Sequence, residues 1–134
     1  MINITSRLWS FWSQFECNGQ PVPAFQEGAV PDGTPFPYIT FSPAKAAAFG
    51  LLPTFATVWV KYTGENSSEG IAQRIAILDA VGRAIPEAGV RLDLPDGFML
   101  LTRGTGDFLI GDTDPDDKTI LVGRILYGIT YYTT

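Results

Sequence analysis

The chain contains no histidine and a single cysteine, Cys17, among its 134 residues. The absence of histidine removes the commonest general base and the commonest metal ligand of protein sites. One cysteine cannot form an intramolecular disulfide or a zinc cluster, and a chain this poor in cysteine suits a reducing compartment. Histidine-dependent catalysis and cysteine-bound zinc are therefore excluded.

Charged residues and long apolar runs are scarce as well. Only 17% of the residues are charged, the net charge is −5, and the nine basic residues are scattered without a run. A protein that grips a nucleic-acid backbone needs clustered Lys and Arg, so we expect no specific nucleic-acid partner. No apolar run approaches the roughly 20 residues of a membrane span. The N-terminal residues also lack the basic leader and cleavage site of a signal peptide. We therefore expect a soluble domain with no membrane partner.

What the chain does contain is apolar and aromatic. Hydrophobic residues make up 46% of it and aromatic residues 13%. A length of 134 residues suits one domain, 1–134, with a single core. Because aromatic side chains are favoured at protein interfaces, this excess predicts a surface covered by other copies of the chain or by a partner.

The first half of the chain predicts one helix, an extended arm and two strands. Leu8, Phe11 and Phe15 recur at helical spacing, which predicts a helix over 5–16. The proline-rich stretch 20–37 is predicted to be an extended arm, because proline cannot donate to a strand ladder. Strands are predicted around 36–42 and over 54–63. The second strand is apolar on both of its sides, as expected when both are covered.

A second helix follows, with Asn66 and Glu69 forming a predicted capping box at its start. Pro86 and Gly89 are predicted to end it. Its predicted core-facing side comprises Ile71, Ile75, Leu78, Val81 and Ile85. A hairpin is predicted around Pro95-Asp96-Gly97, and a long final strand after residue 118. The predicted class is α+β, a single mostly antiparallel sheet flanked by two main helices.

The acidic stretch "GDTDPDDK" at 111–118 is the one candidate for a metal site. Asp112, Asp114 and Asp116 repeat at the spacing of the first three ligands of an EF-hand loop. However, Asp117 occupies the position that needs glycine, and Gly123 the position that needs glutamate. A solvated or partner-facing turn is the favoured interpretation. A small metal-dependent binding or enzymatic domain that uses 112–117 is the alternative. We predict no catalytic residue, no cofactor and no metal ligand.

Several stretches together resemble a known family. The segments "LWSFWSQF", "VPDGTPFPYITFS" and "GFMLLTRGT", and the "DPDDKTI" that leads into the last strand, are similar to tail terminator proteins of siphophages and prophages. These tail-completion proteins are also called minor tail or minor capsid proteins. The resemblance spans nearly the whole chain.

This resemblance implies a virion structural protein without enzymatic activity. Such subunits form a homo-oligomeric ring, a hexamer, that caps the tail tube and offers a surface to the head–tail connector protein. The resemblance places the protein in the virion, at the head–tail interface, after synthesis in the host cytoplasm. DNA passes through the lumen of such a ring. A head-completion adaptor or stopper at the portal side is the alternative within the same class.

Interface residues are predicted where aromatic, proline or charged side chains are prone to exposure. They lie on the first helix, in the arm and around the acidic loop. The predicted set is Trp9, Trp12, Pro35, Phe36, Arg103, Asp112, Asp114 and Asp116.

Overall fold

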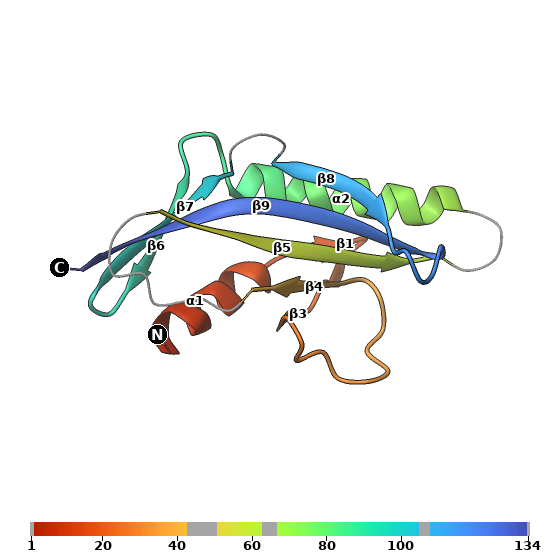
Figure 1. The fold of residues 1–134 in the computed structure, drawn as a ribbon, viewed down its shortest axis with the longest axis horizontal. Helices are drawn as coiled ribbons and strands as arrows, with labels where there is room; N and C mark the ends of the chain where they lie inside the picture. The colour runs from red at the N-terminus through yellow and green to blue at the C-terminus, as the bar shows by residue number, and fades with distance from the viewer. Residues whose placement is uncertain (1, 43–50, 63–66, 105–107, 134) are drawn as a thin grey trace.

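The computed structural model describes residues 2–42, 51–62, 67–104 and 108–133. Two helices and a curled, mostly antiparallel sheet make an α+β fold (Figure 1). In chain order the elements are α1 (Ile2–Trp12), β1 (Glu16–Cys17), β2 (Gln20–Pro21), β3 (Ala24–Gln26), β4 (Tyr38–Phe41), β5 (Leu51–Lys61), α2 (Ser67–Ala84), β6 (Val90–Leu94), β7 (Gly97–Arg103), β8 (Leu109–Thr113) and β9 (Ile120–Thr133).

Two long strands form the centre of the main sheet. β5 and β9 lie side by side along the long axis of the molecule (Figure 1) and pair antiparallel from Leu51↔Thr130 to Lys61↔Ile120. The strand order is β3-β4-β5-β9-β7-β6, and β8 pairs with the part of β9 that β7 leaves free. β3 and β4 pair in parallel, and the other pairings between described strands are antiparallel. The predicted hairpin is confirmed as β6 and β7, joined at Pro95 and Asp96.

Both helices pack on the same face of this sheet. From α1, Trp12 contacts Tyr127 of β9, with ring centroids 5.3 Å apart. From α2, Leu78 lies against Gly123 of β9. Because side chains alternate along a strand, positions 123 and 127 point to the same face. The core between this face and the helices includes the fully buried Leu8, Trp12, Ile39, Phe41, Val58, Ile77, Ile85, Met99, Leu101, Ile125 and Tyr127.

The first helix and the arm differ from their predicted bounds. α1 starts at Ile2 and ends at Trp12, whereas 5–16 was predicted. Its predicted core residues Leu8 and Phe11 are buried, and so is Phe15 just after the helix. The arm contains two short strands, β2, which pairs with β1 just before the arm, and β3, which joins the main sheet at its edge. Short pairings of two or three residues leave no periodic signal in a sequence.

The second helix buries only part of its predicted side, since Leu78, Val81 and Ile85 belong to the core and Ile71 and Ile75 do not. Ile77, Val81 and Ile85 are fully buried, but Ile71 is 38% exposed and Ile75 is 52% exposed. The helix instead meets the sheet through Gly70, where a Cβ would lie 3.1–3.2 Å from Tyr62 and Leu121. The side of α2 that contacts the sheet is therefore rotated toward Gly70. Because glycine has no side chain, a hydrophobic pattern cannot reveal this rotation. The predicted capping residue Asn66 lies outside the described residues.

Candidate interaction surface

The face of the sheet opposite the helices carries a group of aromatic side chains, and we call it the open face. Strand alternation and register place Tyr38 of β4 next to Trp59 of β5 on this side. Phe25 of β3 joins them through its pairing with Thr40. The central strands were predicted to be covered on both sides. In the described part of the chain, helices cover one side only.

The aromatic rings on the open face contact one another in a row. Phe25 and Phe36 lie against Tyr38, with centroids 6.1 and 5.1 Å apart. Tyr38 stacks on Trp59 at 6.3 Å and 25°. The Trp59 indole donates a hydrogen bond of 2.9 Å to the Thr40 hydroxyl, which fixes its ring across the sheet. We call Phe25, Phe36, Tyr38 and Trp59 the aromatic row.

The open face continues beyond the aromatic row. Phe55 on β5 is 38% exposed and Tyr132 on β9 is 44% exposed. Tyr132 stacks on Phe98 at 4.7 Å, and the Arg91 guanidinium lies 4.0 Å from the Phe98 centroid. Large aromatic side chains left partly exposed on one face are typical of a surface that meets another protein. The signal was present in the sequence as a strand that is apolar on both of its sides.

The two predicted tryptophans have opposite environments. Trp9 is 53% exposed, and its indole donates to the Ala24 carbonyl at 3.1 Å, so it lies fixed on the surface between α1 and β3. Trp12 is fully buried between Phe11, Phe15 and Tyr127, and its prediction as an interface residue is therefore wrong. A separation of three residues turns the second ring toward the sheet.

The predicted arm residues lie at the border of a cavity. Exposed Pro35 and half-buried Phe36 line a mainly apolar space of about 450 Å³ together with Pro21, Pro23 and Cys17. Burial raises the pKa of the Cys17 thiol, which keeps it protonated at neutral pH. Phe36 thus links this cavity to the aromatic row.

Arg103 was predicted at an interface, and in the structure its guanidinium contacts the end of α2. It donates to the carbonyls of Ile85 and Gly82, at 2.8 and 3.0 Å, and lies 4.8 Å from the Phe108 ring. These carbonyls belong to the C-terminal end of α2, where unpaired acceptors favour a cation. These hydrogen bonds give Arg103 a role within the fold, and its place at an interface stays a prediction.

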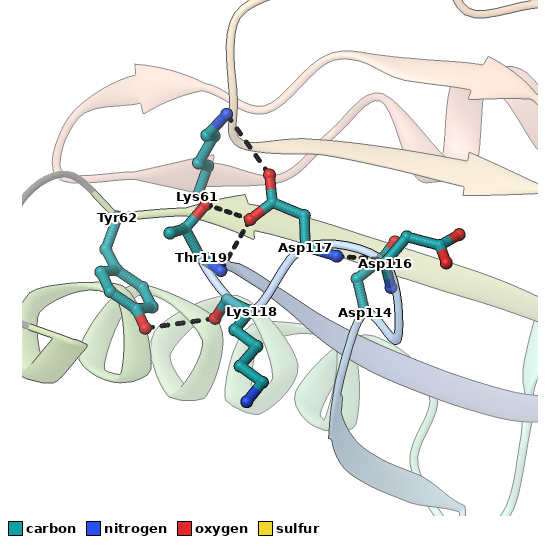
Figure 2. Close-up of polar contacts among 7 residues, drawn as sticks. All are labelled: Lys61, Tyr62, Asp114, Asp116, Asp117, Lys118 and Thr119. Carbon is teal, nitrogen blue, oxygen red and sulfur yellow. Dashed lines mark hydrogen bonds and ion pairs between the residues drawn. The ribbon is translucent and has the colours of Figure 1, made fainter.

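The acidic stretch forms a turn that is held by its own carboxylates (Figure 2). The Asp114 carboxylate accepts from the backbone amides of Asp116 and Asp117, at 2.8 and 3.3 Å. The Asp117 carboxylate accepts from the Thr119 amide and hydroxyl, at 2.9 and 2.6 Å. Its other oxygen lies 3.7 Å from the Lys61 ammonium. The turn is thus a set of side-chain to backbone bonds between β8 and β9.

The four aspartates do not converge on one point. Asp112 lies in β8, where its carboxylate accepts from the Thr113 amide at 2.8 Å, and the Asp116 carboxylate points away from the turn (Figure 2). Among the described residues, no group of three or more aspartate, glutamate, histidine or cysteine side chains could hold a metal ion. Strand β8, which includes Asp112, was not predicted, because its last three residues read as part of a loop.

Comparisons with protein-family models, with curated proteins and with solved structures found no match to this chain. In the described part of the chain, no helix combines the length and apolar character needed to cross a membrane.

Proposed function

We propose that this chain is a tail terminator subunit of a long-tailed bacteriophage, which assembles as a homo-hexameric ring. The ring caps the tail tube and presents a surface to the head–tail connector protein. It is a structural component of the virion and has no enzymatic activity. The sequence resemblance suggests this role, and the open face is the observation that supports it best.

The open face supports assembly because one face of the sheet already completes the core. The helices bury Ile39, Val58 and Ile125 on one side of the three central strands. On the other side, Trp59 and Phe55 stay partly exposed on the same central strand. Aromatic side chains at the centre of a sheet face are favourable interface anchors, because they bury a large area with few rotatable bonds. Exposed Trp9 lies on the helical side, so a subunit of this shape could contact neighbours on two sides.

The direct test combines the purified protein with tail tubes and with DNA-filled heads that lack tails. Native mass spectrometry gives the size of the free protein, and electron microscopy shows where it binds. A tail terminator is expected to form a closed ring at one end of each tube and to stop further tube growth. Binding to heads alone would identify a portal-side adaptor instead. A protein that binds neither tubes nor heads would contradict the proposal.

A further inference from the structure

A groove lies between α1, the C-terminal end of α2 and the edge strand β6. It encloses about 450 Å³. Phe11 and Leu92, each 4% exposed, give it an apolar floor, and the wall formed by α1 and the turn after it carries Arg7, Ser10 and Gln14. No acidic side chain lines it in the described part of the chain. The groove therefore suits a short segment that carries a negative charge.

Arg7 is the cation that this groove offers to a ligand. Its side chain is half-buried, yet it makes no hydrogen bond or ion pair with any described residue. Arg91 also lines the groove, but its guanidinium is engaged by Asp93 at 2.9 Å and by the Phe98 ring. A half-buried cation interacts more strongly with an incoming carboxylate than a fully hydrated one does.

The acidic turn between β8 and β9 supplies a matching carboxylate. The carboxylates of Asp114 and Asp117 hold the backbone of the turn, whereas that of Asp116 has no partner among the described residues. Figure 2 shows it directed away from the turn. The residue is exposed. A carboxylate on a backbone that is already ordered loses little conformational freedom when it binds.

The groove and the turn lie toward opposite ends of the molecule. β6 and α1 are near one end of the long axis, and the connection from β8 to β9 is near the other (Figure 1). Two complementary surfaces at opposite ends cannot meet within one chain, but they can join successive copies head to tail. Such heterologous contacts close into a ring when the rotation between copies fits.

We propose that the groove receives the acidic turn of a second copy of this chain, with Asp116 of that copy paired to Arg7. The inference rests on the proposed function in one respect, since it describes how neighbours in the ring would meet. The open face is then free for the tube or the connector. The contact carries opposite charges, so salt weakens it.

Charge reversal on each side provides the test. The variants are Arg7→Asp and Asp116→Arg, measured separately and as a 1:1 mixture by sedimentation velocity and native mass spectrometry. Each variant alone places like charges at every contact, and we expect self-association to weaken roughly tenfold or more. In the mixture, alternating copies restore opposite charges at every contact, so assembly is expected to recover. A ring with an even number of subunits accommodates this alternation. Asp79→Arg serves as the control, because it reverses an exposed charge on α2, away from the groove and the acidic turn.

The outcomes separate this docking from the proposed function. Recovery only in the mixture supports head-to-tail docking, because a folding defect in either variant could not be cured by the other. Wild-type-like assembly of both single variants would overturn the docking and leave the tail-terminator role standing if tubes are still capped. Failure of the mixture to recover would also overturn it. A wild-type protein that stays monomeric at every concentration would overturn the docking between free subunits. The tail-terminator role would then be tested by tube capping alone.

Discussion

At the scale of single residues, the core contains polar atoms that are buried without a hydrogen-bond partner. The Tyr127 hydroxyl and the Trp12 indole nitrogen have no partner among the described residues, and both residues are almost fully buried. Burial raises the pKa of Tyr127 to about 12, while the Trp12 and Thr54 side chains lie near enough to the hydroxyl to oppose this rise slightly without reaching hydrogen-bond geometry. A buried hydroxyl without a partner costs the free energy of its lost hydration.

We therefore expect Tyr127→Phe to be neutral or stabilising. The phenylalanine ring keeps the contact with Trp12 and removes only the hydroxyl. The free energy of unfolding, measured by urea denaturation, is expected to stay within about 1 kcal/mol of wild type or to rise. Tyr127→Leu is the comparison, because it also removes the ring contact and should destabilise. A large loss of stability on Tyr127→Phe would show that the hydroxyl has a hydrogen-bond partner in solution, such as a bound water.

The Asp117 carboxylate shows how the acidic turn depends on its own hydrogen bonds. Its pKa lies below the ordinary value, chiefly because the Thr119 hydroxyl and amide donate to it, with a smaller contribution from Lys61. The folded state therefore binds this proton less readily than the unfolded state. The stability that this provides is present above the ordinary carboxyl pKa and is lost as pH falls through the lowered one.

Thr119→Val is expected to raise the pKa of Asp117 toward its ordinary value, because it removes the hydroxyl donor at 2.6 Å. Carbon-detected NMR titration of the carboxyl group measures this directly. Stability should then depend less on pH in the acidic range. Thr113→Val is the control, since the Thr113 hydroxyl donates to no aspartate among the described residues. An unchanged Asp117 pKa in Thr119→Val would show that the Thr119 backbone amide and Lys61 are enough to keep this pKa low.

At the scale of elements, a glycine in the longest strand sets how closely α2 approaches the sheet. A Cβ built on Gly123 would lie 2.9 Å from a Leu78 methyl carbon and 3.1 Å from the Leu78 Cγ. Contacts this short require the helix or the leucine to move. Glycine weakens a strand interior, so its presence at this position is explained by close approach of another element.

Gly123→Ala is expected to destabilise the fold by about 1–3 kcal/mol through overpacking against Leu78. Adding Leu78→Ala should recover part of this loss, because the smaller side chain makes room for the methyl group. Urea denaturation of the wild type, both single variants and the double variant gives the coupling between the two sites. If the free-energy changes of the two single variants simply add in the double variant, α2 shifts freely and Gly123 does not set the distance between α2 and the sheet.

At the scale of the whole molecule, the two faces of the sheet differ in what covers them. The helices complete the core on one face, and the open face keeps its aromatic row and Phe55 partly exposed. A protein that left such a face bare in its working state would keep several large aromatic side chains partly in contact with water. This asymmetry is the structural reason for expecting a partner on the open face.

Phe55→Glu is expected to leave the fold intact and to abolish tube capping, because it places a charge on the open face. Ile75→Glu is the matched control, since Ile75 is exposed to a similar degree but lies on the helical side. Thermal unfolding by circular dichroism confirms that both variants fold. Tube capping by Phe55→Glu at wild-type levels would show that this face is not the contact surface.

Prediction from the sequence succeeded where local pattern decides the structure. The hairpin of β6 and β7 and the long final strand follow from turn residues and from alternation over several residues. It failed for Ile71, Ile75 and Trp12, because a periodic pattern shows that a helix has an apolar side but not its rotation against a neighbour. The short strands β2 and β3 were not predicted, because pairings of two or three residues leave no periodic pattern in the sequence.

The sequence alone therefore determined the α+β class, the order of the main elements and the absence of histidine-based chemistry. Only the tertiary structure decided that both helices share one face, that Trp12 is internal while Trp9 is external, and that Arg103 is committed to the end of α2. The physical reason is that periodicity and turn chemistry act between neighbours in the chain. Which faces meet is set by close packing and by hydrogen bonds between residues far apart in sequence.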